Sequence, residues 1–302
     1  MQSIELEIPV DPPLGATLIV PENARAAALI HQGAGVHDRD GNMPAVGFQS
    51  TLYRRLAREL ASRCGLASLR FDKRGSGVPR MTPQAYTIDS RIADARAALQ
   101  VLRRHDATRG LPVFLIGHSE GALVVAKLAE SEDVRGVASL AAPFGNVFEL
   151  GRERARRVAR EAKGPQQAKA ELALEYHDRL EELFREGARF LPEEFVEFAK
   201  PYLDAGYAGW ESYEWLAGHW ASALESDPTA HGRRMLVVQG GRDARLWPDN
   251  LQRWQAWCES RSLAEFKAIE HMGHDLNDAR QKAFRLDEDV LECLCDWLTR
   301  LL

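Results

Sequence analysis

Cysteine is rare in this chain, with four among its 302 residues. The four form no Cys-x-x-Cys pair, and none has the spacing to a histidine that is typical of zinc ligands. Each cysteine is therefore expected to fill space in the core as a small apolar side chain. The sequence predicts no disulfide framework and no metal site. The four residues are Cys64, Cys258, Cys293 and Cys295.

The chain also lacks an excess of positive charge, since its net charge is −5 at pH 7. Nucleic-acid-binding domains are usually basic, so this balance argues against that class. No apolar run is long enough to span a membrane, and residues 1–5 lack the basic start of a secretory signal. We expect a reduced, cytoplasmic protein that acts on a small-molecule substrate and binds neither nucleic acid nor membranes. The sequence leaves open whether the chain forms a homodimer.

Short apolar runs alternate with stretches of helical periodicity through most of the chain. The run at 26–30 is followed by Leu52, Leu56 and Leu60, which would lie on one face of a helix. The run at 112–116 is apolar throughout, as expected of a parallel strand buried on both faces. This alternation favours an α/β fold with a mostly parallel sheet flanked by helices. Further strands are predicted at 66–71, 134–140, 234–238 and 266–269.

The strand pattern disappears between residues 144 and 230. Charged amphipathic stretches replace it, and apolar residues from 172 to 183 form one helical stripe. The strand–helix alternation then resumes. We therefore predict one α/β core, made of residues 1–143 and 231–302, that is interrupted by a helical cap at 144–230.

Residues 117–121 read Gly-His-Ser-Glu-Gly and lie between a predicted buried strand and an apolar helix. In that setting a Gly-x-Ser-x-Gly motif predicts a tight turn that holds its serine in a strained conformation. The start of the helix directs free N–H groups toward a developing oxyanion. Ser119 is therefore the predicted nucleophile, with His118 packed beneath it. The alternative is an ordinary glycine-bounded turn with an exposed serine.

A serine nucleophile needs a histidine base that is held by a carboxylate. Where the serine lies on such a turn, the acid follows it in the chain and the histidine comes last. Asp243 follows one predicted strand and His274 follows the next, at the edge where open α/β sheets build their sites. We predict these two residues as acid and base. Asp275 is the rival acid and His271 the rival base.

Two backbone N–H groups are expected to stabilise the oxyanion. One belongs to Glu120, directly after the nucleophile. The other should come from the glycine-rich loop after the 26–30 strand, where Ala34 is the first candidate and Gly35 and Gln32 follow. The loop lacks the lysine and hydroxyl residue of a phosphate-binding P-loop, which favours the oxyanion hole.

Four segments resemble those of bacterial α/β hydrolases that are grouped with peptidase-like and dienelactone-hydrolase-like esterases. Residues 32–41 resemble the Gly-Ser-Gly-x-x-Asp-Arg-Asp-Gly loop of that group, with Ala34 in place of the serine. Residues 70–77 resemble its Arg-x-Asp-x-Arg-Gly-x-Gly segment. Residues 117–121 match its Gly-His-Ser-Glu-Gly elbow, and residues 240–243 match its acid loop.

The resemblance implies a serine hydrolase of the α/β-hydrolase superfamily, with esterase, thioesterase or related acyl-hydrolase activity and no cofactor. It does not select the substrate, because this fold hosts many chemistries. A lyase or acyltransferase on the same scaffold stays open, as does a non-catalytic binding protein.

Asp38 and Arg39, two charged residues of the first segment, are expected to have a structural role. In this role an ion pair fixes the loop beside Asp72 or Arg74. Direct contact with the substrate is the alternative.

The predicted cap is rich in aromatic and basic residues near its two ends. Trp210, Trp215 and Trp220 are expected either to line the substrate pocket or to form the core of the cap. The arginine-rich stretch at 152–160 is expected to be a solvated helix face interleaved with acids. Binding of an anionic substrate group is the alternative for these arginines.

Overall fold

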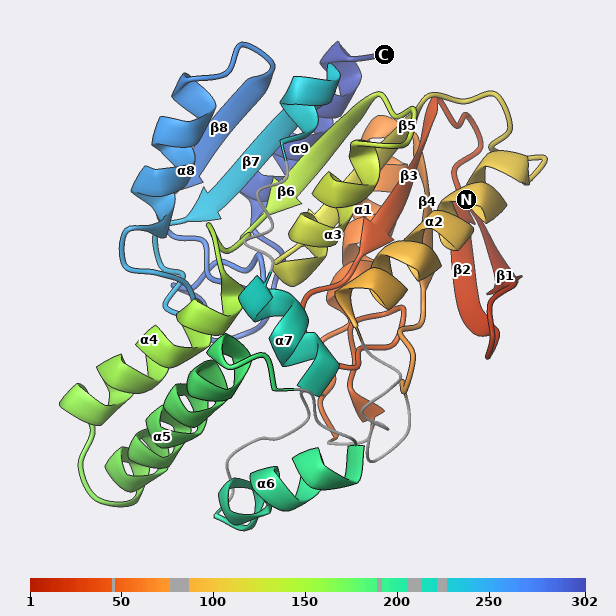
Figure 1. Cartoon of the computed structure of the whole chain (residues 1–302). Coiled ribbons are helices and arrows are strands. Elements are labelled where there is room, and N and C mark those ends of the chain that lie inside the picture. The colour runs from red at the N-terminus through yellow and green to blue at the C-terminus, as the bar shows by residue number, and fades with distance from the viewer. Residues whose placement is uncertain (45–46, 77–86, 189–191, 206–212, 222–226) are drawn as a thin grey trace.

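The strands of the protein build one central sheet. The structure, a computed structural model, describes residues 1–44, 47–76, 87–188, 192–205, 213–221 and 227–302. The strands are β1 (Gln2–Ile8), β2 (Leu14–Val20), β3 (Ala26–His31), β4 (Leu66–Phe71), β5 (Val113–His118), β6 (Gly136–Leu140), β7 (Arg234–Gly240) and β8 (Ala264–Ile269). Within these ranges they form an eight-stranded sheet in the order β1-β2-β4-β3-β5-β6-β7-β8 (Figure 1). β1 and β2 pair antiparallel with their neighbours, and the remaining strand pairs are parallel.

Helices cover both faces of this sheet. They are α1 (Leu52–Cys64), α2 (Ile88–Arg104), α3 (Glu120–Ala129), α8 (Asn250–Glu259) and α9 (Glu288–Arg300). In β5, Phe114 and Ile116 pack with α1 and α9, whereas Val113 and Leu115 pack with α2 and α3. Successive side chains of a strand point to opposite faces, so a strand covered on both faces needs apolar residues throughout. The predicted sheet flanked by helices is confirmed.

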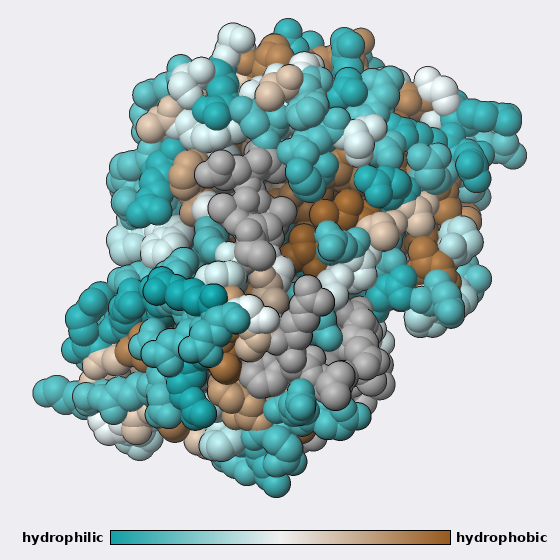
Figure 2. All heavy atoms as spheres, viewed as in Figure 1, coloured by the Kyte–Doolittle hydropathy of each residue, from teal (hydrophilic) through white to brown (hydrophobic). Residues whose placement is uncertain are grey.

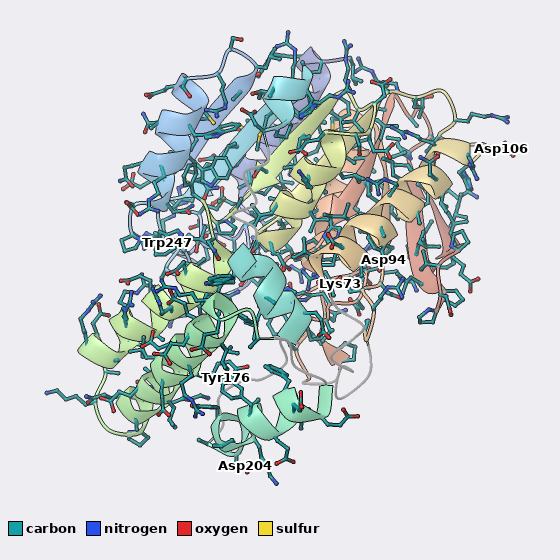
Figure 3. All side chains as sticks on the ribbon, in the orientation of Figure 1. Lys73, Asp94, Asp106, Tyr176, Asp204 and Trp247 are labelled. Atoms are coloured by element: carbon teal, nitrogen blue, oxygen red, sulfur yellow. The ribbon has the colours of Figure 1, made fainter. Side chains whose placement is uncertain are left out.

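The chain between β6 and β7 forms a second group of helices. They are α4 (Val147–Glu161), α5 (Pro165–Arg185), α6 (Pro192–Asp204) and α7 (Tyr213–Ala221), followed by a short 3₁₀ helix, η3 (Pro228–His231). Figure 1 shows α4 to α7 below the sheet. Tyr176 points from α5 toward α6 (Figure 3), where its ring centroid lies 5.0 Å from that of Tyr202. Ile88 of α2 belongs to the same apolar cluster, so these helices also pack on the core.

Two expectations from the sequence concern the cysteines and the lack of membrane-spanning segments. Cys64, Cys258, Cys293 and Cys295 are free thiols that lie in or against the apolar clusters of the core, as expected. Among the described residues, no helix is both long and apolar enough to cross a lipid bilayer.

The first turn of α3 lies very close to the end of β3. A Cβ atom on Gly121 would lie 2.4 Å from the carbonyl oxygen of Gln32 and 2.6 Å from that of His31. On the other side of the turn, a Cβ atom on Gly117 would lie 2.4 Å from the Cα of Ala122. Neighbouring backbone therefore requires glycine at both positions, which explains the two glycines of the motif.

Substitution of Gly121 tests this contact. Gly121→Ala should lower the free energy of unfolding by about 1–3 kcal/mol, because the added methyl group forces the two backbone segments apart. Urea denaturation measures the loss. Gly218→Ala is the matched control, since a Cβ atom there would meet Ile88 Cγ1 at an ordinary 3.7 Å. Equal losses in the two variants would contradict the close contact.

Candidate active site

Ser119 occupies a strained turn between β5 and α3. Its φ of 54° and ψ of −127° lie in a region that residues other than glycine rarely adopt. The Ser119 N–H donates to the carbonyl of Leu140 at 2.8 Å, and the Ser119 carbonyl accepts from the N–H of Ala122 at 3.0 Å. These bonds hold the turn, and the Ser119 side chain lies at the wall of a cavity.

His274 and Asp243 lie in line with the Ser119 hydroxyl. His274 Nε2 is 3.0 Å from Ser119 Oγ, and His274 Nδ1 is 2.8 Å from Asp243 Oδ2. The other carboxylate oxygen, Oδ1, accepts the N–H of Arg245 at 3.0 Å. The Asp243 side chain is only 3% exposed. Because an ionised carboxylate can only accept hydrogen bonds, Nδ1 carries the imidazole proton and the Nε2 lone pair faces the serine.

The rival residues lie elsewhere. His271 Nε2 is 2.9 Å from Asp287 Oδ2, and Asp287 is the N-cap residue of α9. Asp275 pairs with Arg245 at 3.2 Å and lines the cavity, whereas the carboxylate that contacts His274 Nδ1 belongs to Asp243. The structure therefore brings together Ser119, Asp243 and His274, and it places the His271 side chain beside Asp287, the N-cap residue of α9.

The two residues predicted to supply the oxyanion-hole N–H groups border one cavity. Ala34 and Glu120 both line it beside Ser119. Glu120 is the first residue of α3, and the N–H groups in the first turn of a helix have no acceptor within that helix. In the described part of the chain, the N–H of Ala34 donates no hydrogen bond either. Its neighbour Gly33 is excluded, because the Gly33 N–H donates to the Tyr53 hydroxyl at 2.8 Å.

Tyr53 and His118 link this loop to the backbone of His274, a connection that sequence reasoning missed. His118 Nε2 is 2.7 Å from the carbonyl oxygen of His274, so Nε2 donates and Nδ1 accepts. The Tyr53 hydroxyl is 2.9 Å from that Nδ1 and therefore donates to it. The chain of bonds from Gly33 through Tyr53 and His118 to His274 fixes the loop relative to the base. Tyr53 lies on the apolar stripe of α1, where its sequence position carries no sign of this role.

Lys73 is a second residue that sequence reasoning missed. Its buried ammonium donates to the carbonyl oxygens of Gly33 and Gly35, the latter at 3.2 Å. With these carbonyl groups held inward, the peptide of Ala34 between them is fixed in orientation. Figure 3 labels Lys73 below α2 and beside α7. Its place in the 70–77 motif was the one available signal, but the motif does not say what the lysine contacts.

The cavity has a volume of about 470 Å³ and a largely apolar wall. α4 contributes Val147, Leu150 and Arg154 to the wall, so this helix borders the site. The other apolar side chains come from the core and its loops, namely Val36, Met43, Phe48, Leu52, Pro143 and Leu246.

The predicted pocket tryptophans are placed differently. Trp210 lies outside the described residues. Trp215 is 5% exposed, and its Nε1 donates to Glu120 Oε1 at 2.7 Å. The Trp220 ring packs on Phe184, with centroids 5.6 Å apart. Neither Trp215 nor Trp220 is among the described residues that line the cavity. These two rings contribute to the packing of α7, and their role as substrate contacts stays a prediction.

The arginine-rich stretch is interleaved with acids, as expected, but it is not solvated throughout, because the Arg152 side chain is only 16% exposed. Arg152 pairs with Glu149 at 3.1 Å, and Arg160 pairs with Glu153 at 3.3 Å. Polar and charged residues cover the outer surface of α4 and α5 (Figure 2). Of this stretch, Arg154 reaches the cavity wall in the described structure.

The loop after β3 is held by an ion pair between Arg39 and Asp72, one of the two neighbours expected, whereas Asp38 accepts backbone N–H groups. Arg39 donates to both carboxylate oxygens of Asp72, at 3.0 and 2.7 Å. Asp38 accepts the N–H groups of Asp40 and Asn42 at 2.9 and 2.8 Å, which closes the turn that follows. Both charged residues therefore have structural partners.

Comparison with known proteins gives one family and several distant relatives. Residues 28–285 match the model of the Alpha/beta hydrolase family. Esterase EstD of Thermotoga maritima is 24% identical over 289 residues, which cover 91% of this chain and 62% of EstD. The chain thus spans about 62% of the length of that curated relative.

Solved structures share the fold at low sequence identity. Est1E from Butyrivibrio proteoclasticus has a TM-score of 0.60 and 15% identity, with 98% of each chain covered. Dienelactone hydrolase from Anabaena variabilis has a TM-score of 0.52 and 14% identity, with 99% of this chain and 96% of that one covered.

The buried His118 makes stability depend on pH. Burial, with a further contribution from the neighbouring His274, lowers the pKa of His118 to about 3 from its ordinary 6.5. Between these values the unfolded chain binds more protons than the folded chain. The free energy of unfolding should therefore fall as the pH drops from 6.5 toward 3, by up to about 1.4 kcal/mol per pH unit from this group.

Urea denaturation at pH 4, 5, 6 and 7 measures this dependence. His118→Gln should be less stable at pH 7 but should show a flatter dependence on pH. The exposed His231 supplies the control, since His231→Gln should retain the wild-type slope. An unchanged slope in His118→Gln would contradict the assignment of His118 as a buried neutral group.

Proposed function

Since this chain belongs to the alpha/beta hydrolase family, we propose that it is a serine hydrolase that cleaves small to medium esters or thioesters. The observation that carries the proposal is the contact of Ser119 Oγ with His274 Nε2 at 3.0 Å, backed by Asp243 at 2.8 Å. The strained turn at Ser119 supports it, because strain of this kind is retained at functional sites. The name of the relative EstD supports the choice of an ester.

In the proposed reaction, Ser119 Oγ attacks the acyl carbon while His274 Nε2 takes the hydroxyl proton. The carbonyl π electrons move to the oxygen, and the N–H groups of Ala34 and Glu120 stabilise the oxyanion. The oxyanion then collapses, the C–O or C–S bond breaks, and His274 returns the proton to the leaving group. Water repeats the sequence on the acyl-enzyme, with His274 as the base. Asp243 holds the imidazole in the required tautomer and stabilises the imidazolium.

The shape and wall of the cavity support an acyl group of small to medium size. A volume of about 470 Å³ suits such a substrate, and the largely apolar wall favours a hydrophobic acyl chain. We also assign residues 144–230 as a cap over the site. Val147 and Leu150 of α4 support this assignment, because they share the cavity with Ser119.

Ser119→Ala tests the nucleophile. The variant should lose turnover of p-nitrophenyl acetate, butyrate and octanoate by about 10⁴-fold or more, because no acyl-enzyme can form. It should also lose labelling by a fluorophosphonate probe, which reacts with activated serines. Circular dichroism should show an unchanged fold. Labelling that persists in the variant would disprove the assignment.

A matched pair of variants tests the base. His274→Gln should lower kcat by about 10³-fold or more with little change in KM, because the base acts in the transition state. His271→Gln removes a neighbouring histidine that pairs with Asp287, and should cost stability while kcat stays near the wild-type value. The reverse outcome, with His271→Gln the inactive variant, would show that the base is misassigned.

A further inference from the structure

Glu120 has two groups that face different surroundings. Its N–H belongs to the proposed oxyanion hole, while its carboxylate is buried, and the residue is 1% exposed. The oxygen Oε1 accepts Trp215 Nε1 at 2.7 Å and His219 Nε2 at 2.7 Å. The oxygen Oε2 pairs with the guanidinium of Arg91. The Glu120 carboxylate therefore connects α3, on which it lies, to two other helices. It contacts α7 through Trp215 and His219, and α2 through Arg91.

The carboxylate is held in the ionised form by these partners. Burial by itself raises the pKa of Glu120. The hydrogen bond and charge of His219, the charge of Lys73 and the Trp215 hydrogen bond outweigh burial and keep the pKa below its ordinary value. A buried carboxylate that loses a partner is strongly destabilised, so its geometry is tightly determined by the donors around it.

Lys73 extends the same cluster to the other half of the oxyanion hole. Its ammonium holds the carbonyl groups of Gly33 and Gly35, on either side of Ala34. We refer to Lys73, Arg91, Glu120, Trp215 and His219 as the Glu120 cluster; each of them is at most 5% exposed. The backbone on both sides of the hole is thus supported by one buried group of charged and hydrogen-bonding side chains, and α7 supplies two of its members.

We propose that Glu120 is a positioning residue that couples the packing of α7 on the core to the geometry of the oxyanion hole. The proposal rests on the proposed function, because it concerns the hole of the same site. When α7 is in place, its two donors fix the carboxylate and with it the first turn of α3. When a donor is lost, the carboxylate moves toward its remaining partners, and the Glu120 N–H moves with the backbone. The cap helix thus influences kcat through the geometry of the oxyanion hole.

Two substitutions of similar size at His219 separate this role from packing. His219→Met removes the donor, whereas His219→Gln retains an N–H near the position of Nε2. His219→Met should lower kcat on p-nitrophenyl acetate by about 10–100-fold with KM within about twofold, because a displaced oxyanion donor weakens only the transition state. His219→Gln should stay within about threefold of the wild-type kcat.

A trifluoromethyl ketone gives an independent reading of the hole. Ser119 adds to its carbonyl carbon, the proton passes to His274, and the oxyanion occupies the hole. The inhibition constant should rise in His219→Met in proportion to the loss in kcat/KM. If His219→Met does not fold, Trp215→Phe removes the other donor of α7 and should show the same pattern.

His177→Met is the matched control within the cap. His177 is buried on α5, where its ring packs against Phe148 and Tyr176. Its loss should lower the melting temperature and leave kcat within about twofold of wild type. The proposal is overturned if His177→Met lowers kcat as much as His219→Met, or if the Gln and Met variants at 219 lose kcat equally.

Amide hydrogen exchange separates this proposal from the proposed function. If the wild-type chain neither cleaves esters nor labels at Ser119, the proposed function fails. The coupling is then judged by exchange alone, which should be faster at residues 117–124 in His219→Met than in His219→Gln. Equal exchange in the two variants would overturn the coupling whatever the reaction.

Discussion

The close contact between the first turn of α3 and the end of β3 is the constraint on which the candidate site depends. Gly121 lies against the carbonyl groups of His31 and Gln32, and a Cβ atom on Gly33 would lie 3.0 Å from Ser119 Cβ. Two segments that are far apart in the chain are thereby held at contact distance. Ser119 lies on one segment and Ala34 on the other, so any loosening of the contact would separate Ser119 from the loop that contains Ala34.

Three buried side chains near this contact, those of Tyr53, Lys73 and His118, form hydrogen bonds that hold it. Tyr53 and His118 connect the oxyanion loop to the backbone of His274, and Lys73 holds the loop from below. Such networks are rigid because each lost partner leaves a desolvated polar group. Rigidity of this kind suits the stabilisation of an oxyanion, since donors that are already in place need not reorganise as charge develops.

Much of the fold and the principal residues of the candidate site could be predicted from sequence. The apolar run of β5 and the motif after it predicted Ser119, the ends of β7 and β8 pointed to Asp243 and His274, and the structure brings these three side chains together. Four short motifs indicated the alpha/beta hydrolase family, which is confirmed. The choice between His271 and His274 was harder. The two residues share one loop, and what separates them is the contact of His271 with Asp287 at the start of α9.

Periodicity and strand ends are local properties. They predicted β3 to β8 but not the antiparallel strands β1 and β2, and they indicated which edge of the sheet bears the polar residues. The partners of a buried side chain are not local, because they depend on how distant segments pack. Trp215 shows the difference. The sequence predicted that Trp215 packs in the cap. It was compatible with a position in the wall of the substrate pocket and with a position in the core of the cap. Only the tertiary structure shows that the indole N–H of Trp215 donates to Glu120. A buried carboxylate requires hydrogen-bond donors, and the packing of α7 on the core brings Trp215 within hydrogen-bond distance of it.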